Sequence, residues 1–284
     1  MAISKLQRIQ IRWNALGDSD PCSINVKETN KELKRNQAFL GKYLDFNSPY
    51  KNLLIYHGLG SGKTRTAINV YNVLYNYTPG WNVFILLPAS LKPNWEEELN
   101  QFLEKEDKEA RRGNIRFISA NASNADKAFM EAVKNSDTSK KNMFLIDDVH
   151  KFIGNVYSNI SSKQGKRAQN IYEYIIQDQQ ENPDTRVLVL SATPAANNPF
   201  ELALLFNLLR PKIFPKSETQ FNHEFVSSSN FRSINPVRKN LFQRRIMGLV
   251  SYYYGSTPDY FASQKTEYVY VKMSPYQEDI YEHF

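Results

Sequence analysis

A short run rich in glycine, ending in lysine and threonine, has the composition of a loop that binds phosphate. It follows the apolar run Leu53–Tyr56 and contains Gly58, Gly60, Ser61, Gly62, Lys63 and Thr64. Glycines let backbone N–H groups turn toward phosphate oxygens, and the amino end of a following helix adds a favourable dipole. In such a loop we expect Lys63 to reach the β- and γ-phosphates and the Thr64 hydroxyl to bind Mg²⁺. The sequence therefore predicts a site for a nucleoside triphosphate with magnesium.

One position departs from the common G-x-x-x-x-G-K-[ST] spelling of this loop. The first glycine of that pattern would fall at position 57, which is His57 here. The remaining glycines still leave the loop free to close. The competing interpretation is a glycine-rich turn with a chance Gly-Lys-Thr, and the strand before it and the helix after it argue against that.

A pair of carboxylates follows a second apolar run, Met143–Ile146. We expect Asp147 to hold magnesium, directly or through water, and Asp148 to orient or deprotonate the attacking water. Glutamate is more usual at the second position, so the shorter Asp148 predicts a bridging water or slower hydrolysis. The alternative is a solvent-exposed Asp-Asp turn. His150 alone would suggest a structural histidine, but its place after the acidic pair favours a role in the site.

Two hydroxyl residues, Ser191 and Thr193, follow the apolar run Val187–Leu190. They could hydrogen-bond His150 or an acidic side chain and so report the state of the γ-phosphate to another surface. The alternative is that they simply cap a turn between strand and loop.

The elements that must position these residues are short apolar runs separated by amphipathic segments. The runs are Leu53–Tyr56, Val83–Leu87, Ile115–Ile118, Met143–Ile146 and Val187–Leu190. Their near-continuous apolarity suits strands buried on both faces, and the spacing of Ala67, Tyr71 and Leu74 and of Trp95, Leu99 and Phe102 predicts helices between them. Alternation of strands and helices predicts an α/β fold with a parallel, doubly wound sheet.

Other segments are read from composition. Residues 154–170, rich in glycine, serine, asparagine and lysine, predict a flexible surface loop. After Pro211 the alternation stops. There we expect a basic helical stretch with Arg238, Lys239, Arg244 and Arg245, an alternating strand at Tyr268–Val271 and a helix over 277–284. The chain then stops without a capping signal, which suggests a piece of a longer protein.

Composition sets limits on function. The net charge of +7 favours a polyanionic partner such as nucleic acid. The single cysteine, Cys22, excludes an intramolecular disulfide and the usual multi-cysteine metal site. No apolar run approaches the roughly 20 residues that span a bilayer, so no membrane partner is expected.

The loop, the acidic pair and Ser191-Ala192-Thr193, in that order, resemble the motifs of superfamily 2 helicases and translocases. Leu87-Pro88-Ala89-Ser90-Leu91 followed by Asn94-Trp95 is similar to motif Ia of the Swi/Snf branch. The phrases Tyr56–Thr64 and Asn197–Leu202 resemble helicase-like ATPases of large cytoplasmic DNA viruses. That group includes poxvirus nucleoside triphosphatase I and the small subunit of the early transcription factor.

This resemblance implies a RecA-like ATP-binding domain and further roles for named residues. Gln37 is placed like the adenine-reading glutamine of a Q motif, although an ordinary surface residue is nearly as plausible. Motif Ia offers Ser90, Lys92 and Asn94 as donors to nucleic-acid phosphates, more plausibly DNA than RNA. The family resemblance also implies a place in the virion and host cytoplasm. The partners it implies are viral RNA polymerase or other transcription factor subunits.

The resemblance also sets expected domain boundaries. We expect an N-terminal arm over residues 1–35, the RecA-like domain over 36–215, and over 216–284 a helical and strand extension leading toward a second RecA-like domain. Because that second domain supplies arginines to the γ-phosphate, this chain alone should bind nucleotide but hydrolyse it poorly.

Three functions remain open at this point. The leading one is an ATP-dependent nucleic-acid motor in viral transcription. The second is a structural or recruitment subunit with a weakened ATPase, which Asp148 mildly favours. The third, a kinase or small GTPase with a phosphate loop, is opposed by the motif Ia and Ser-Ala-Thr segments and by the missing Asn-Lys-x-Asp signature.

Overall fold

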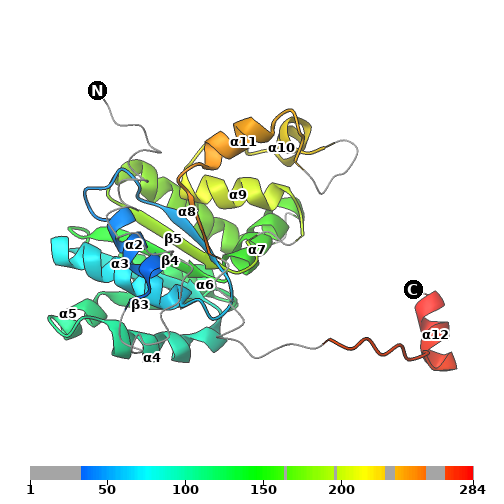
Figure 1. The fold of residues 1–284 in the computed structure, drawn as a ribbon, viewed down its shortest axis with the longest axis horizontal. Helices are drawn as coiled ribbons and strands as arrows, with labels where there is room; N and C mark the ends of the chain where they lie inside the picture. The colour runs from blue at the N-terminus through cyan, green and yellow to red at the C-terminus, as the bar shows by residue number, and fades with distance from the viewer. Residues whose placement is uncertain (1–32, 163–164, 195–196, 228–233, 254–265, 284) are drawn as a thin grey trace.

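Six parallel strands form the centre of the protein, seen in the computed structural model (Figure 1). The structure describes residues 33–162, 165–194, 197–227, 234–253 and 266–283, so most of the arm expected over residues 1–35 lies outside the described residues. The strands are β1 (Leu53–His57), β2 (Trp81–Leu87), β3 (Ile115–Ser119), β4 (Lys141–Asp147), β5 (Arg186–Ser191) and β6 (Val250–Tyr253).

The strand order in space is β3-β2-β4-β5-β1-β6, and every neighbouring pair is parallel. The first five strands match the five apolar runs of the sequence. All seven residues of β2 are buried, as expected for a strand covered on both faces. The predicted α/β fold with a parallel sheet is confirmed.

Helices cover both faces of this sheet. The described helices are α2 (Arg35–Tyr43), α3 (Lys63–Tyr77), η1 (Ala89–Leu91), α4 (Lys92–Phe102), α5 (Lys108–Gly113), α6 (Ala125–Lys134), α7 (Val149–Ser162), α8 (Arg167–Glu181), α9 (Phe200–Leu209), α10 (Glu218–Phe225), α11 (Lys239–Ile246) and α12 (Pro275–Glu282). Helices α2, α3 and α4 share one apolar core with the sheet, and α6 to α11 share the other. Successive residues of β2 alternate between the two cores, because side chains along a strand point to opposite faces.

Helix α3 begins directly at the phosphate loop and carries the predicted pattern of apolar residues. Ala67, Tyr71 and Leu74 are all buried. The helix ends at Tyr77, and Thr78 has an extended backbone (φ −153°, ψ 124°). Pro79 explains this ending, since the residue before a proline is disfavoured in the helical region.

The segment 154–170 is mostly helical, so the predicted flexible loop is wrong. Helix α7 runs to Ser162 and α8 starts at Arg167. Their polar composition hides amphipathic spacing. Phe152, Ile153 and Val156 of α7 are buried, as are Ala168, Ile171, Tyr172 and Ile175 of α8. Burial of these apolar faces stabilises α7 despite its serines and asparagines, and α8 despite its many charged and amide side chains.

The C-terminal part differs from the sequence prediction in two places. First, β6 extends the sheet beside β1, so the main sheet includes residues beyond the expected boundary at 215. Second, Tyr268–Val271 is irregular and exposed rather than a strand. The described residues provide no neighbouring strand for it, and alternation alone does not form a strand without a surface to cover. The predicted basic helix is α11, and the predicted last helix is α12.

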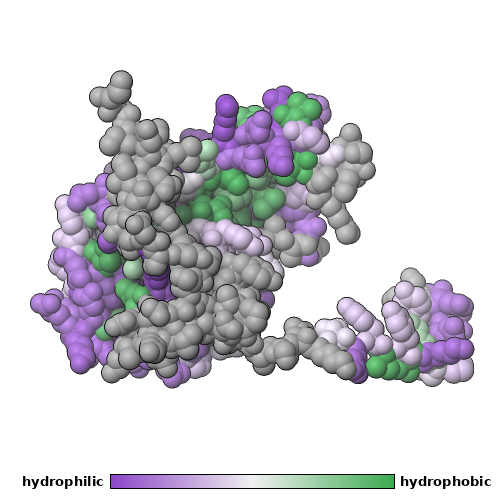
Figure 2. All heavy atoms as spheres, viewed as in Figure 1, coloured by the Kyte–Doolittle hydropathy of each residue, from purple (hydrophilic) through white to green (hydrophobic). Residues whose placement is uncertain are grey.

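An aromatic cluster attaches helices α9, α10 and α11 to the rest of the domain. Phe214 lies 5.0 to 6.3 Å, centroid to centroid, from the rings of Phe206, Phe221, Phe225 and Phe242. Figure 2 shows hydrophobic side chains over α9 and hydrophilic ones on α11 above it. Helices α10 and α11 therefore pack as a layer on α9, and Lys239 and Arg244 of α11 lie exposed on its outer side.

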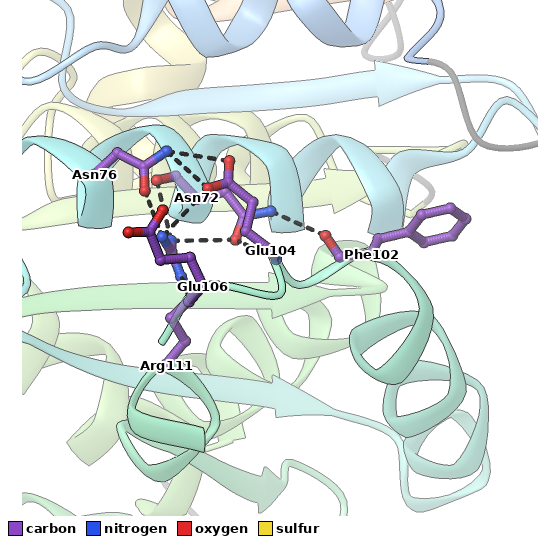
Figure 3. A network of polar contacts seen from close by, with 6 residues as sticks. All are labelled: Asn72, Asn76, Phe102, Glu104, Glu106 and Arg111. Atoms are coloured by element: carbon purple, nitrogen blue, oxygen red, sulfur yellow. Dashed lines mark hydrogen bonds and ion pairs between the residues drawn. The ribbon is translucent and has the colours of Figure 1, made fainter. Parts of the chain in front are cut away.

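A buried arginine joins the α4–α5 segment to helix α3 (Figure 3). The Arg111 side chain is 2% exposed and donates to the side chains of Asn72, Asn76 and Glu104 and to the backbone carbonyl of Glu106. Buried charges are stable only when hydrogen-bonded in this way. Within the described residues, no helix is long and apolar enough to cross a membrane.

Candidate nucleotide-binding site

The predicted phosphate loop, acidic pair and Ser-Ala-Thr segment all lie at one edge of the sheet. The loop follows β1, the acidic pair ends β4 and Ser191 ends β5, and these three strands are neighbours in the order β4-β5-β1. The carboxyl ends of parallel strands form the usual ligand-binding edge of such sheets. The fold therefore brings together residues that are far apart in the sequence.

The loop is closed by its own side chains. The Lys63 Nζ atom donates to the carbonyl oxygens of His57 (3.2 Å) and Gly58 (3.1 Å), and Ser61 Oγ donates to Gly58 O (2.7 Å). The ammonium group therefore lies within the loop. A phosphate would offer it charged acceptors, which make stronger hydrogen bonds than these two carbonyls.

Two glycines give the loop its backbone path. Gly60 and Gly62 have φ angles of 68° and 80°, in the left-handed region that favours glycine. At Gly62 a side chain would also lack space, because a Cβ atom would lie 2.5 Å from Nε2 of Gln37. The loop thus favours glycine at position 62 for its backbone angle, and any larger residue would also have to displace the end of the Gln37 side chain.

Gln37 supports the loop from behind. Its Nε2 atom donates to Gly62 O at 3.2 Å, its Oε1 atom accepts from Lys34 N at 2.9 Å, and the residue is 1% exposed. In this structure the amide of Gln37 is engaged with the protein backbone. Its predicted reading of adenine stays a prediction that would need the amide to exchange these partners.

The acidic pair is held at the carboxyl end of β4. Asp147 Oδ1 accepts from the backbone N–H of Asp148 at 2.9 Å, and its Oδ2 accepts from Nε1 of Trp95 at 2.8 Å. Asp148 has a left-handed backbone (φ 53°) and its Oδ2 forms an ion pair with Lys151 Nζ at 2.9 Å. Both carboxylates are half-buried.

The electrostatics of the site favour a cation at the carboxylates and an anion at the loop. Burial raises the pKa of Asp147, and the hydrogen bonds from Trp95 and Asp148 oppose that rise. Burial lowers the pKa of Lys63, while the nearby carboxylates of Asp147 and Asp148 act in the opposite direction. Both half-buried charges would gain from ligands of opposite sign, the carboxylate from a metal ion and the ammonium from phosphate.

The donor set fits magnesium. Thr64, at the start of α3, offers a hydroxyl and Asp147 a carboxylate, and both are oxygen ligands of the kind that Mg²⁺ prefers. In the described part of the chain no group of three or more His, Cys, Asp or Glu side chains could hold a metal by itself. Magnesium would therefore take its other ligands from phosphates and water, as it commonly does.

His150 and the Ser-Ala-Thr segment form the predicted connection. The Nδ1 atom of His150 lies 3.1 Å from Ser191 Oγ, and that hydroxyl also accepts from the backbone N–H of Thr193 at 2.9 Å. Ser191 is buried and Thr193 is exposed. A chain of hydrogen bonds thus leads from the acidic motif on β4 to the loop after β5.

His57, the unusual residue of the loop, is fully buried. Its Nε2 atom lies 2.9 Å from Ser251 Oγ of β6, and its Nδ1 atom has no hydrogen-bond partner among the described residues. Burial, together with the charge of Lys63, lowers the pKa of His57 from 6.5 to about 4. The backbone N–H of Gly58 also donates to Tyr253 O at 2.9 Å, so β6 supports the start of the loop.

The predicted nucleic-acid residues lie on the surface next to this site. Ser90 in η1 and Lys92 and Asn94 in the first turn of α4 are all exposed. The helix starts at Lys92, and the residue after Asn94 is the buried Trp95. Sequence reasoning placed Trp95 on a helix but missed its hydrogen bond to Asp147. The only hint of this hydrogen bond in the sequence was the position of Trp95 close to Lys92 and Asn94, which were predicted to contact nucleic acid.

These features define a domain that binds a nucleoside triphosphate through a phosphate loop. The chain belongs to the SNF2-related domain family, whose model matches residues 32–284. This membership confirms the resemblance to the Swi/Snf branch and makes the chain a superfamily 2 helicase-type ATPase domain.

Similar proteins come from viruses. A putative ATP-dependent RNA helicase of Acanthamoeba polyphaga mimivirus is 50% identical over 277 residues, which cover 94% of this chain and 34% of that protein. Nucleoside triphosphatase I of Melanoplus sanguinipes entomopoxvirus is 27% identical over 272 residues, covering 92% of this chain and 40% of that protein. The chain thus spans roughly a third to two fifths of these relatives.

A solved structure of the Sulfolobus solfataricus SWI2/SNF2 ATPase core in complex with dsDNA is also similar. It is 17% identical, with a TM-score of 0.48, and the match covers 76% of this chain and 42% of that chain.

Proposed function

We propose that this chain is the nucleotide-binding lobe of a motor that hydrolyses ATP to move along or remodel nucleic acid. The observation that carries this proposal is the meeting of three groups at one sheet edge. They are the phosphate loop, the Asp147-Asp148 pair and the His150–Ser191 contact. The first two can bind and hydrolyse a triphosphate, and the third offers a route from the nucleotide to another surface.

Each residue has a chemical role in this proposal. Lys63 holds the β- and γ-phosphates, and Thr64 and Asp147 hold Mg²⁺, which when bound neutralises phosphate charge. Asp148 orients the attacking water and accepts its proton, a general-base role suited to a half-buried carboxylate at this position. His150 and Ser191 respond to the γ-phosphate.

The test is binding and hydrolysis of ATP by residues 1–284, with Lys63→Met as the comparison. The wild-type chain should bind ATP with Mg²⁺, and the variant should lose that binding because it removes the ammonium from the loop. Failure of the wild-type chain to bind would contradict the proposal.

Hydrolysis by this chain alone should be slow even with DNA. The family resemblance implies that arginines from a second RecA-like domain complete the catalytic site. A single-turnover assay with and without DNA measures this. Rapid turnover stimulated by DNA would show that residues 1–284 suffice.

We propose DNA in preference to RNA as the substrate, with a role in viral transcription. Membership of the SNF2-related family supports a nucleic-acid substrate, and resemblance to viral transcription ATPases supports the role. The name of the mimivirus relative points instead to RNA. Competition binding with duplex DNA, single-stranded DNA and duplex RNA of one sequence decides between them.

A second candidate is a recruitment subunit with a weakened ATPase. The ion pair of Asp148 with Lys151 favours it, because the carboxylate would have to leave this contact before it could orient the attacking water. Replacing Asp148 by glutamate separates the two. If Asp148→Glu restores hydrolysis to an inert protein, the recruitment role gains support.

A further inference from the structure

Helix α4 carries exposed polar side chains and a contact to the metal-binding carboxylate within a single turn. Lys92 and Asn94 are exposed, whereas Trp95 is fully buried. The indole Nε1 atom of Trp95 donates to Asp147 Oδ2 at 2.8 Å. Four residues of an α-helix span only about 5 Å along its axis, so these groups move together.

The indole contact fixes the direction of the Asp147 carboxylate. One carboxylate oxygen accepts from the backbone of Asp148 and the other from Trp95, so rotation of the group would break a hydrogen bond. The indole N–H can only donate, and burial keeps water away from Trp95. Separation of the pair would leave a buried donor without a partner, which is costly.

The opposite end of α4 is fixed to helix α3. Asn72 of α3 donates through Nδ2 to Phe102 O at 3.0 Å and accepts from the backbone N–H of Glu104 at 3.4 Å, as Figure 3 shows. The Arg65 guanidinium carbon also lies 4.2 Å from the centre of the Phe102 ring. A force applied at the first turn of α4 would therefore displace Trp95 while the last turn stays with α3.

We propose that Trp95 is a positioning residue that orients Asp147 for Mg²⁺ and transmits nucleic-acid contacts at Lys92 and Asn94 to that carboxylate. This inference rests on the proposed function, since it assumes that Asp147 binds magnesium, and on the sequence prediction that Lys92 and Asn94 of α4 contact nucleic acid. It adds a direct connection between the two sites through one side chain.

Two variants and a control test the orienting role. Trp95→Phe keeps an aromatic ring and removes the donor, and a benzothienylalanine at position 95 keeps the bicyclic shape without the N–H. The control is Trp81→Phe. Trp81 is equally buried, and its indole donates to Leu74 O at 3.4 Å at the other end of β2. Circular dichroism and thermal unfolding without ligand establish that each variant folds.

The first readout is binding of ADP with Mg²⁺ and with EDTA. Loss of the donor should weaken magnesium-dependent binding about ten- to hundredfold, the usual effect of removing a group that orients a metal ligand. Binding in EDTA should stay at the wild-type level, and Trp81→Phe should alter neither. Wild-type magnesium dependence in both position-95 variants would overturn the orienting role.

The second readout is the affinity for duplex DNA with ADP, with and without Mg²⁺. Coupled sites affect each other reciprocally, commonly by about fivefold or more, so magnesium should change DNA affinity in the wild-type chain by that amount. The two position-95 variants should lose this difference. Absence of coupling in the wild type, or its persistence in the variants, would overturn transmission through Trp95.

These outcomes are distinct from failure of the proposed function. If the wild-type chain binds no nucleotide at all, the proposed function fails. If it binds nucleotide with Mg²⁺ and the position-95 variants behave like wild type, only the inference about Trp95 fails.

Discussion

Asp148 combines a strained backbone with a side chain that already has a cationic partner. Its φ of 53° lies in the left-handed region, which asparagine and aspartate tolerate better than most other residues. The turn at Asp148 allows its N–H to reach the carboxylate of Asp147. The local conformation therefore favours a short polar residue at this position.

We expect Asp148→Asn to preserve the fold and abolish most hydrolysis. Asparagine tolerates the same φ, so the free energy of unfolding should change by less than about 1 kcal/mol. Loss of the proton acceptor should slow single-turnover hydrolysis about 100-fold or more. Urea unfolding and rapid-quench assays measure the two effects. Asp148→Ala serves as the control for the backbone conformation and should be less stable than Asp148→Asn. Equal rates of hydrolysis in Asp148→Asn and wild type would contradict the role assigned to Asp148.

His57 should make the protein less stable in mild acid. The unfolded chain binds a proton at this side chain below about pH 6.5, whereas the buried imidazole beside Lys63 does so only near pH 4. Between these values the unfolded state holds more protons, so stability falls as the pH falls from 7 to 4. A pKa shift of this size corresponds to about 3 kcal/mol in the free energy of unfolding.

Urea unfolding from pH 7 to pH 4 measures this effect against His57→Gln. The variant should lose the part of the pH dependence that His57 causes. Ser251→Ala removes the hydrogen-bond partner but keeps the buried imidazole, so it should be less stable and keep the slope. Identical slopes in wild type and His57→Gln would refute the prediction.

The individual site residues were predictable where a motif determines them. Lys63, Thr64, Asp147, His150 and Ser191 all lie at the predicted edge of the sheet. The hydrogen bonds from Trp95 to Asp147 and between His57 and Ser251 were not predictable, because each joins residues that only the folded chain brings together.

At the scale of elements, helix α4 presents the exposed residues predicted to meet phosphates. Lys92 has a weak ion pair with Glu96 at 3.8 Å, and both side chains are largely exposed. Such pairs contribute little to stability, so Lys92 is free to exchange its partner for a phosphate.

We expect Lys92→Ala to weaken DNA binding without altering nucleotide binding. Loss of one phosphate contact should lower the slope of log affinity against log salt by about 1. Fluorescence anisotropy over a range of salt concentrations gives this slope. Lys108→Ala, which alters a half-buried lysine of α5 bonded to Asn100 O, is the control and should keep the wild-type slope. The same slope in Lys92→Ala and wild type would exclude Lys92 as a phosphate contact.

Elements were predictable when their own residues carried the pattern. Strands β1 to β5 and helices α3 and α4 were of this kind, although the edge strand β3 is only partly buried. Helix α7 was missed because serine and asparagine dominate its exposed face, and the start of α8 because charged and amide side chains do so there. Strand β6 was missed because its four residues are identified only by pairing with β1. A strand needs a partner, and this also explains why Tyr268–Val271 is irregular. Its alternating residues have no surface to cover among the described residues.

At the scale of the whole molecule, the aromatic cluster suggests that residues beyond 215 fold together with the sheet. Phe242 of α11 packs on Phe206 of α9, and β6 pairs with β1. This packing would make residues 36–253 one cooperative unit, a different division from the boundary expected at 215.

Phe214→Ala tests that cooperativity. Truncation of a buried phenylalanine commonly costs about 3–5 kcal/mol, so we expect a loss of this size. Circular dichroism and tryptophan fluorescence should report one shared transition. Two separate transitions, in which helices α10 and α11 unfold before the sheet, would instead show that the residues after 215 form an independent unit. Val237→Ala, at an 86% exposed position, is the control and should unfold like wild type.

The position of β1 between β5 and β6 also has a consequence during synthesis. The strand that leads into the phosphate loop is made early, yet both of its partners come much later in the chain. Until residues 250–253 leave the ribosome, one edge of β1 has no neighbour, and an open apolar edge is prone to pair with other chains. Long-range parallel pairing is also slow to form. We therefore expect nascent chains to acquire nucleotide binding late, and to depend on chaperones until then.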